Sequence, residues 1–392
     1  MGIRTQVFTK ELPFHVPDIG EEEIQSVVAT LRSGWLTTGP MVKQFEKQFA
    51  EQVGCRYAVA VNSCTAALHL ALEAIGIQEG DEVIVPTMTF TATAGVVTYF
   101  KAKPVLVDIR EDTFTIDVQK LEQAITPRTK AIIPVHFGGQ PCEMDLIIDI
   151  AHRYKIKVIE DAAHALPATY KGNMIGTLGD ISCFSFYATK NITTGEGGMA
   201  TTNNPEWADR MRLMSLHGMS RDAWNRYEAQ GSWYYEISSP GFKYNLTDLA
   251  AAIGIPQLRR SDEFWKRRLA HAVQYNRGFK DVPEIRIPTV QNDVQHSWHL
   301  YVIQLEVDRL RLGRGQFIDL LTKQGIGTSV HFIPLHLHPW YRDHLEYAPK
   351  DFPVAGRVYE RIVSLPLYPK MEAADVQYVI DVVQEVVKEY RR

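Results

Sequence analysis

The chain has 392 residues, of which 45% are hydrophobic and 22% are charged, and its formal net charge is −4. This length exceeds one small domain and allows two or three units, one of them a large α/β layer structure. The near-neutral charge offers no basic surface for nucleic acid, and no segment approaches the roughly 20 apolar residues of a membrane span. Nucleic-acid-binding and membrane-spanning proteins are therefore not among the expected classes.

Two features of the sequence indicate a cytoplasmic protein. Residues 1–17 contain no apolar run long enough for a signal peptide. The four cysteines (Cys55, Cys64, Cys142 and Cys183) are scattered, with no CxxC pair and no zinc-finger spacing. The sequence therefore predicts neither a disulfide framework nor a structural metal site, and it fits a reducing compartment.

From about residue 55 to residue 202, short β-branched runs alternate with amphipathic stretches, the pattern of βαβ units on a mostly parallel sheet. The expected strands are Tyr57–Val61, Glu82–Val85, Pro104–Val107, Ala131–Val135, Lys157–Ile159, Ile181–Phe186 and Gly198–Thr201. The expected helices between them are Thr65–Ile75, Val118–Ala124 and Met144–Tyr154. This part of the chain is expected to be an α/β layered domain.

After about Leu258 the pattern changes to that of a smaller α+β domain. Its expected elements are the helices Ser261–Phe279, Gly313–Lys323 and Ala373–Tyr390 and the strands Leu300–Leu305 and Gly327–His331. We therefore expect a large α/β domain over residues 15–255, a small domain over 256–392 and an N-terminal extension over 1–14. The helix Glu21–Leu31 and the loop Ser33–Pro40 fit either domain. Ligands usually bind at the carboxyl ends of parallel strands, in clefts of this kind.

The segment NSCTAALHLAL (Asn62–Leu72) places small polar residues between a strand and a helix. The free N–H groups at such a helix start attract phosphate, which Ser63, Cys64 and Thr65 are placed to bind. An ordinary helix cap at Ser63 or Thr65 explains the same pattern.

The segment VIEDAAHALPA (Val158–Ala168) ends a β-rich run with two carboxylates. A buried carboxylate there can hold a pyridine nitrogen in its protonated form, so that the ring accepts electrons. We choose Asp161 over Glu160 for this role. The alternative is a solvated acidic turn.

The segment FSFYATKNITTGEGGM (Phe184–Met199) places Lys190 after an apolar strand and before a glycine-rich turn. A lysine in a dry pocket loses its charge more easily and becomes a nucleophile for an aldehyde. Ser185, five residues earlier, is a candidate phosphate ligand. A lone lysine is usually a solvated surface residue, so the prediction depends on this position.

The segment PTMTFTATA (Pro86–Ala94) places Phe90 at a strand end beside small residues. Its aromatic face can stack on a flat cofactor ring. A core phenylalanine is the alternative.

Taken together, these four segments resemble the DegT/StrS family of nucleotide-sugar aminotransferases, which use pyridoxal 5′-phosphate (PLP). The likeness covers nearly the whole chain and includes SGWLTTGP (Ser33–Pro40), PGFKYNLTDLAAAIGIPQL (Pro240–Leu258) and VHFIPLH (Val330–His336). It implies the aspartate-aminotransferase architecture (fold type I), with a PLP-binding large domain of mostly parallel mixed sheet. Within the family, the chain is similar to members that aminate a 4-keto sugar on UDP, including those that form UDP-4-amino-4-deoxy-L-arabinose.

The resemblance also implies roles for individual residues. Lys190 forms the Schiff base with PLP, Asp161 pairs with the ring nitrogen, and Phe90 stacks on the ring. His164 lies near the ring hydroxyl, where many relatives have a glutamine. The positions that bind the phosphate are Cys64, Thr65 and Ser185, with the backbone N–H as the contact at Cys64.

Two further sets of residues follow from the same resemblance. Asn245, or else Lys243, reaches the phosphate from the neighbouring subunit. Many relatives have NYR where this chain has Lys243–Asn245, so both residues stay candidates. The residues expected to meet the sugar nucleotide are Trp35, Thr38, Tyr187, His331 and His336.

The function implied is transfer of an amino group from L-glutamate, which leaves as 2-oxoglutarate, to a nucleotide-linked keto sugar. The product would be an amino sugar for lipopolysaccharide or other cell-surface glycans, and the enzyme would be a cytoplasmic homodimer with shared active sites. The alternatives are a PLP-dependent sugar dehydratase, in which a histidine replaces the Schiff-base lysine, and a non-catalytic regulator of the same fold. A zinc site in HFIPLHLHPWY (His331–Tyr341) needs further ligands, and we expect no metal.

Overall fold

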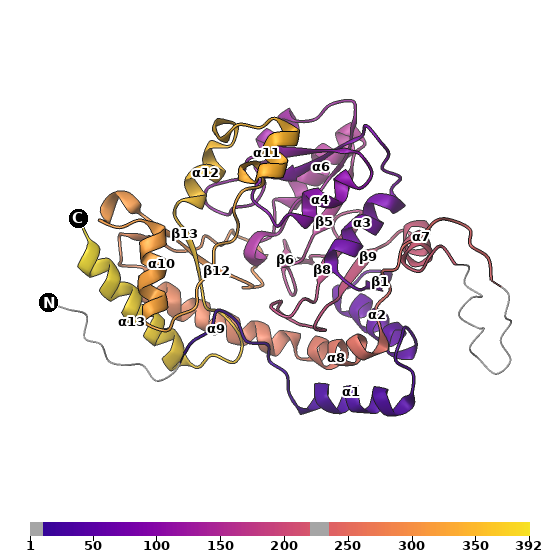
Figure 1. The fold of residues 1–392 in the computed structure, drawn as a ribbon, viewed down its shortest axis with the longest axis horizontal. Helices are drawn as coiled ribbons and strands as arrows, with labels where there is room; N and C mark the ends of the chain where they lie inside the picture. The colour runs from indigo at the N-terminus through magenta and orange to yellow at the C-terminus, as the bar shows by residue number, and fades with distance from the viewer. Residues whose placement is uncertain (1–10, 220–234) are drawn as a thin grey trace.

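The computed structural model describes residues 11–219 and 235–392, and within these residues the chain forms one large and two small sheets (Figure 1). The large sheet has the spatial strand order β1-β9-β8-β5-β4-β2-β3. Its strands are β1 (Tyr57–Val61), β2 (Glu82–Pro86), β3 (Lys103–Val107), β4 (Thr129–Ile132), β5 (Lys157–Asp161), β8 (Ile181–Ser185) and β9 (Gly198–Thr202). All neighbouring pairs from β8 to β3 are parallel, whereas β9 is antiparallel to both β1 and β8. The predicted mostly parallel mixed sheet is confirmed.

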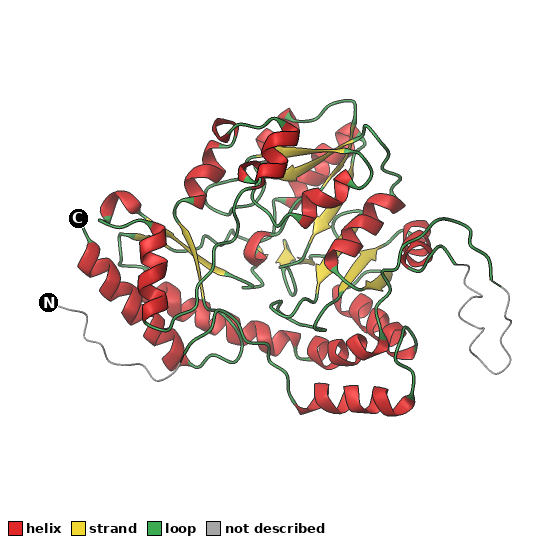
Figure 2. Ribbon diagram, viewed as in Figure 1, coloured by secondary structure: helices red, strands yellow, loops and turns green. Residues whose placement is uncertain are grey.

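Helices cover both faces of this sheet, as Figure 2 shows. Alternate side chains of a strand point to opposite faces, so Val59 and Val61 of β1 belong to one core while Ala58 and Ala60 belong to the other. The first core is completed by α3 (Cys64–Ala74), α4 (Ala92–Thr98) and α7 (Pro205–Ser215). The second is completed by α2 (Pro40–Val53), α5 (Val118–Gln123), α6 (Met144–Tyr154) and α8 (Asp248–Arg259).

The C-terminal part of the chain builds a third core around a small antiparallel sheet of order β10-β12-β13. Its elements are β10 (Ile285–Arg286), β12 (Tyr301–Leu305), β13 (Ile362–Leu365), α9 (Ser261–Phe279), α10 (Arg314–Lys323) and α13 (Ala373–Tyr390). The rings of Tyr275 and Tyr301 pack at its centre, with centroids 4.7 Å apart. In Figure 1, α8 and α9 follow one another along the lower edge and connect the large sheet to this small domain.

The remaining elements are short or lie outside these cores. They are α1 (Glu21–Ser33), β6 (Thr169–Tyr170), β7 (Asn173–Met174), β11 (Val294–Gln295), α11 (Pro339–Leu345), α12 (Pro353–Tyr359) and the 3₁₀ segments Phe137–Gly139, Val307–Arg309, Leu335–Leu337 and Pro349–Asp351. No helix of the described residues is both long enough and apolar enough to cross a membrane.

Two expectations differ from the observed packing. Gly327–His331 is not a strand, because the segment makes only one isolated bridge to the small sheet, at Ser329, while Gly327 donates to the carbonyl of Leu12. The expected small domain, residues 256–392, is not one packing unit either. Leu335, Tyr341, Phe352 and Val358 join the core on the large sheet. The division at residue 255 therefore stays a prediction.

A buried carboxylate fixes the loop that leads into α2. The side chain of Asp248, 1% exposed, accepts hydrogen bonds from the backbone N–H groups of Gly39 (2.8 Å), Met41 (3.1 Å) and Val42 (3.0 Å). Such N–H groups at a helix start have no partner within the helix, and a negative charge there also complements the helix dipole. Asp248 therefore holds the loop of Trp35 and Thr38 against α8.

We expect Asp248→Ala to lower the free energy of unfolding by about 3 kcal/mol, because it leaves buried N–H groups without acceptors. Denaturant titration of the variant and the wild type measures the difference. The control is Asp262→Ala at the exposed start of α9, which should stay within about 0.5 kcal/mol of the wild type. Equal losses in the two variants would contradict the assignment.

Candidate active site

A cavity of about 320 Å³ lies where β2, β5 and β8 end and α3 begins. The carboxyl ends of parallel strands are the usual ligand-binding edge of such a sheet. It is lined by Ser63, Cys64, Thr65, Leu68, Thr89, Phe90, Ala92, Val135, Asp161, Ala163, His164, Ser185, Tyr187, Thr189, Lys190, Glu196, Gly197, His299, His331 and Phe332. The structure thus brings together ten of the residues expected from the sequence, from five separate segments.

Asp161 supplies the carboxylate of this cavity. It is 5% exposed, and its Oδ2 accepts a hydrogen bond from Thr93 Oγ1 (2.7 Å) while its Oδ1 accepts one from the N–H of Ala163 (3.2 Å). Burial raises the pKa of the Asp161 carboxyl, and these two hydrogen bonds oppose that shift. The side chain is therefore held in place for a cationic or N–H partner.

The neighbouring carboxylate, Glu160, is turned away from the cavity. Successive side chains of β5 point to opposite faces of the sheet. Glu160 is fully buried and accepts hydrogen bonds from His136 Nε2 (3.0 Å), Ser182 Oγ (2.6 Å) and the N–H of Gly179 (2.8 Å). Its hydrogen-bonding capacity is used within the core, so it does not act in the cavity.

Lys190 supplies the amine. It follows β8 on a turn in which its N–H donates to the carbonyl of Tyr187 (2.9 Å). Burial lowers the pKa of Lys190 to about 8, although the charge of Asp161 favours the ammonium form. An amine with this pKa is partly uncharged near neutral pH, as a nucleophile or a proton acceptor must be.

The start of α3 offers this cavity the free N–H groups that an anion site requires. Ser63 Oγ accepts the N–H of Ala66 (3.1 Å), which confirms the cap, while Cys64 and Thr65 occupy the first helical positions, where N–H groups lack helical partners. Gly198 of β9 packs against the backbone at the start of α3. A larger residue does not fit at this position, because its Cβ would lie 2.5 Å from the carbonyl carbon of Ser63. Ser63, Thr65 and Ser185 line the same cavity.

Three histidines also line this cavity, and all three are neutral. Burial holds the pKa of His164 and of His299 well below the usual range and lowers that of His331 to about 4, with the charge of Lys190 acting in the same direction. These three histidines therefore add no positive charge to the cavity.

Aromatic rings form the mouth of the cavity. Phe90 is 60% exposed, so it is not a core phenylalanine, and its centroid lies 6.1 Å from that of Phe332. Tyr187, also exposed, lines the same cavity. Such surfaces suit a flat ring or a sugar.

Four of the expected residues gather at a second cavity, of about 660 Å³: three line it, and the fourth, Lys243, is hydrogen-bonded to one of them. Trp35, Thr38 and Asn245 line it. Asn245 Nδ2 donates to Thr38 Oγ1 (2.7 Å), and Lys243 Nζ donates to Asn245 Oδ1 (2.6 Å). Within the single chain this group is separate from the Lys190 cavity.

His336 is not brought to either cavity. It is fully buried, its Nδ1 is hydrogen-bonded to Thr87 Oγ1 (2.7 Å), and its ring stacks on Phe352 with centroids 4.5 Å apart. The expected substrate contact of His336 therefore has no support in this structure, because the ring is packed in the core beneath the strand end.

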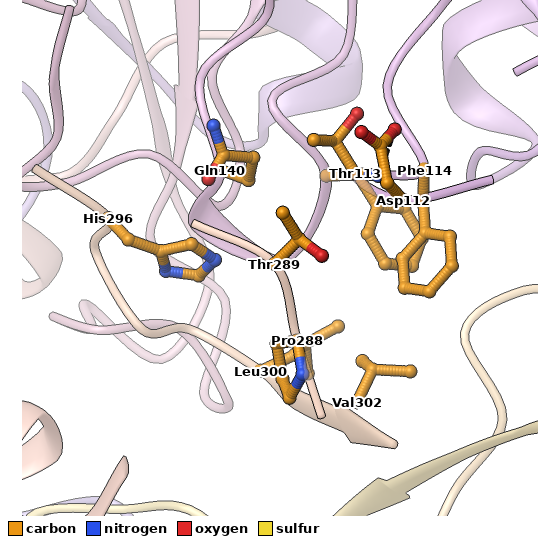
Figure 3. A pocket seen from close by; sticks show the side chains of 11 residues that line it. Asp112, Thr113, Phe114, Gln140, Pro288, Thr289, His296, Leu300 and Val302 are labelled. Atoms are coloured by element: carbon orange, nitrogen blue, oxygen red, sulfur yellow. Dashed lines mark hydrogen bonds between the residues drawn. The ribbon is translucent and has the colours of Figure 1, made fainter. Parts of the chain in front are cut away.

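A smaller cavity lies beyond Gly138 and Leu300 (Figure 3). Gln140, Thr289 and His296 contribute its polar groups, beside the ring of Phe114. Its free space is about 20 Å³, too small for a cofactor or a sugar nucleotide. No cluster of three potential metal ligands occurs among residues 11–219 and 235–392. The larger Lys190 cavity is thus the candidate active site.

Sequence reasoning missed several residues of this site. Thr93 lies in the segment singled out for Phe90, and only the fold shows that it bonds Asp161. His299 carries no motif of its own in the sequence, yet it lines the cavity just before β12. Phe332 follows His331, and Glu196 lies in the glycine-rich turn after Lys190; neither carried a separate signal.

A family model described as the DegT/DnrJ/EryC1/StrS aminotransferase family matches residues 17–384. The chain is 54% identical to MJ1066 of Methanocaldococcus jannaschii, an uncharacterised protein, over 97% of this chain and 98% of MJ1066. It is also 54% identical to the spore coat polysaccharide biosynthesis protein SpsC of Bacillus subtilis, over 96% of this chain and 97% of SpsC.

Among solved structures, the fold matches Spr1654 of Streptococcus pneumoniae, described as a sugar aminotransferase and solved in PLP, PMP and apo forms. The match to the PLP form has a TM-score of 0.91 at 38% identity and covers 97% of this chain and 99% of that chain.

The lowered pKa of Lys190 predicts how its amine reacts. Because only the uncharged amine attacks an aldehyde, the rate at which the protein stripped of cofactor attaches PLP should rise with pH and level off above about 8. Absorbance stopped-flow measures the rate. A free lysine derivative, with a pKa of about 10.4, is the control and should keep accelerating beyond that point. Parallel profiles for the two amines would contradict a buried, perturbed lysine.

Proposed function

Because the chain belongs to the DegT/DnrJ/EryC1/StrS aminotransferase family and is a PLP-dependent sugar aminotransferase, we propose that it transfers the amino group of L-glutamate to C-4 of a UDP-linked keto sugar. Glutamate leaves as 2-oxoglutarate, and the amino sugar serves cell-surface glycan synthesis. The description of SpsC as a spore coat polysaccharide biosynthesis protein supports a glycan product.

One observation carries the proposal: Lys190 and Asp161 line a single cavity at the start of α3. A mobile amine, a fixed carboxylate and a phosphate-sized anion site are the three groups that PLP requires. The presence of lysine at position 190 also disfavours the dehydratase, in which a histidine replaces it.

The residues present fit PLP, and each has a separate task. The start of α3, with Ser63, Thr65 and Ser185, would bind the phosphate, and Asp161 would face the ring nitrogen. When bound, PLP supplies an electron-accepting ring that stabilises negative charge on the substrate carbon. The charge of Asp161 keeps that ring nitrogen protonated.

Lys190 moves the proton. Its Nζ, uncharged in part near pH 8, accepts a proton from the substrate carbon and returns it at the next stage. The three histidines of the cavity, with lowered pKa values, do not hold a proton near neutral pH, whereas the pKa of Lys190, about 8, suits this transfer.

We also propose that two chains build each active site. Trp35, Thr38, Lys243 and Asn245 gather at a second cavity of the same chain, with the polar side chains already linked by hydrogen bonds. A symmetric dimer would place this cavity against the Lys190 cavity of the partner, where Asn245 or Lys243 could reach the phosphate. Light scattering measures the mass of the active enzyme in solution. A monomer with full activity would contradict this arrangement.

We place the enzyme in the cytoplasm. Its four cysteines are all free, as is usual in a reducing compartment. Recovery of the native protein only from a secreted or membrane fraction would argue against this location.

We expect Lys190→Ala to lower the rate of amino transfer by roughly 10³-fold or more, because it removes both the attachment point and the base. Asp161→Asn should lower it by about 10²-fold while the protein still folds. Single-turnover absorbance measurements with glutamate report both effects. The control Lys130→Ala, at an exposed position of β4, should match the wild type. Unchanged turnover in either active-site variant would remove that residue from the mechanism.

The acceptor is tested directly with a panel of nucleotide-linked keto sugars. The enzyme is first converted to its amine form with glutamate, and each sugar is then added while the PLP absorbance is followed. We expect the UDP-linked 4-keto sugar to restore the PLP band faster than the dTDP- or GDP-linked sugars or a 3-keto isomer. A faster response to another nucleotide or to the 3-keto sugar would overturn the proposed substrate but not the aminotransferase activity.

A further inference from the structure

The segment 242–245, which brings Lys243 and Asn245 to the second cavity, is an extended stretch held by its backbone on both sides. The carbonyl of Tyr244 accepts from the N–H of Asn62, just after β1 (2.7 Å), and the N–H of Tyr244 donates to the last carbonyl of α7 (2.8 Å). Isolated antiparallel bridges at Lys243 and Asn245 continue this pairing. Alternate side chains of extended backbone point to opposite sides, so Tyr244 faces away from Lys243 and Asn245.

His69 of α3 meets the segment on the Tyr244 side. Its Nδ1 lies 3.0 Å from the hydroxyl oxygen of Tyr244, and His69 is only 6% exposed. Burial lowers the pKa of His69 to about 4, so the ring is neutral near neutral pH and the hydrogen bond joins two neutral groups. On the opposite side of the segment, Asn245 lines the second cavity and accepts from Lys243 Nζ (2.6 Å).

Aromatic rings surround the imidazole of His69. Its centroid lies 4.6 Å from that of Phe242, 4.9 Å from Phe100, 5.2 Å from Tyr99 and 5.8 Å from Tyr244. A phenylalanine at position 69 would also place an aromatic ring in this cluster. The contribution that a phenylalanine lacks is the hydrogen bond to Tyr244.

One helix links this contact to the cofactor cavity of the same chain. Cys64, at the start of α3, lines that cavity, and His69 lies roughly 7.5 Å further along the helix axis, at about 1.5 Å per residue. The helix start has its own supports, because Ser63 caps it and Gly198 packs against it. The polar contact of His69 is with Tyr244 instead, on the segment that carries Lys243 and Asn245.

We propose that His69 is a positioning residue for the active site of the neighbouring chain. Its hydrogen bond to Tyr244 fixes the segment 242–245, so that Lys243 and Asn245 are held in place for the phosphate of the PLP bound by that chain. This inference rests on the shared active sites proposed above. Its distinctive consequence is that loss of the bond weakens PLP binding by the neighbouring chain and leaves PLP binding by its own chain unchanged.

The test uses mixed dimers in which one chain lacks the Schiff-base lysine. Two differently tagged chains are co-expressed, and the mixed dimer is purified over both tags. The silent chain carries Lys190→Ala, so PLP attaches only to Lys190 of the other, reporting chain. Titration of the stripped mixed dimer with PLP, followed by the absorbance of the attached cofactor, gives the dissociation constant of the reporting site. The silent chain supplies the segment 242–245 to that site.

We expect His69→Phe in the silent chain to raise this dissociation constant about tenfold, the effect of losing one buried hydrogen bond. The same substitution in the reporting chain should leave it within about twofold of the wild type. Tyr244→Phe, which removes one oxygen and keeps the ring, should depend in the same way on the chain that carries it. An effect confined to the reporting chain, an equal effect from either chain, or no effect from either would overturn the proposal.

A double-mutant cycle in the silent chain separates the hydrogen bond from general damage to the aromatic cluster. If the bond is the cause, His69→Phe and Tyr244→Phe together should weaken PLP binding no more than either does alone. Effects that multiply would show that the two side chains act independently, against the proposal. His152→Phe, at an exposed position of α6, is the matched control and should leave the dissociation constant unchanged from either chain.

A variant of the segment itself separates this inference from the shared active site. Lys243→Ala combined with Asn245→Ala in the silent chain should weaken PLP binding at the reporting site. If this variant has its effect and His69→Phe has none, the positioning role of His69 is wrong and the shared site stands. If the segment variant has no effect from the silent chain, the shared site is wrong and the role of His69 is overturned with it.

Discussion

The site depends on keeping an amine and a carboxylate out of water in one cavity without letting them neutralise each other. Desolvation acts in opposite directions on the two groups, since it lowers the pKa of Lys190 and raises that of Asp161. The structure resolves this by holding Asp161 with Thr93 and the N–H of Ala163. The carboxylate is thereby stabilised without an ion pair to the lysine, and the amine stays free to react.

The surrounding fold supplies the rigidity that such a site needs. Asp161 ends a central parallel strand, Lys190 follows the next strand, and the anion site is the first turn of a helix with an apolar face buried on the same sheet. Buried histidines stay neutral around them. Asp161 and the anion site therefore sit on regular elements and Lys190 on the turn after one, whereas the aromatic mouth of the cavity, with Phe90 and Tyr187, is exposed and built from loops.

Much of this arrangement could be predicted from local sequence. The strand Tyr57–Val61 and the helix Met144–Tyr154 have the expected bounds, because hydrophobic periodicity and turn residues determine them locally. The cluster around Lys190 could be anticipated because most of its members lie at the end of a strand or just after one. Contacts between segments that are far apart in the sequence could not be predicted in this way. The hydrogen bond from Thr93 to Asp161, the bond from Asn191 to His299, and the burial of His336 against Phe352 all depend on tertiary packing. Gly327–His331 was expected to be a strand, but its backbone groups pair instead with Leu12 and, at Ser329 alone, with the small sheet.

The central claim is that the amine at position 190 lies in a dry cavity against a bound PLP ring. The most direct measurement is to treat the holoenzyme with borohydride, digest it and locate the attached pyridoxyl group by peptide mass spectrometry. The account predicts a single modified peptide with the label on Lys190. A label on another lysine, or spread over several, would contradict it.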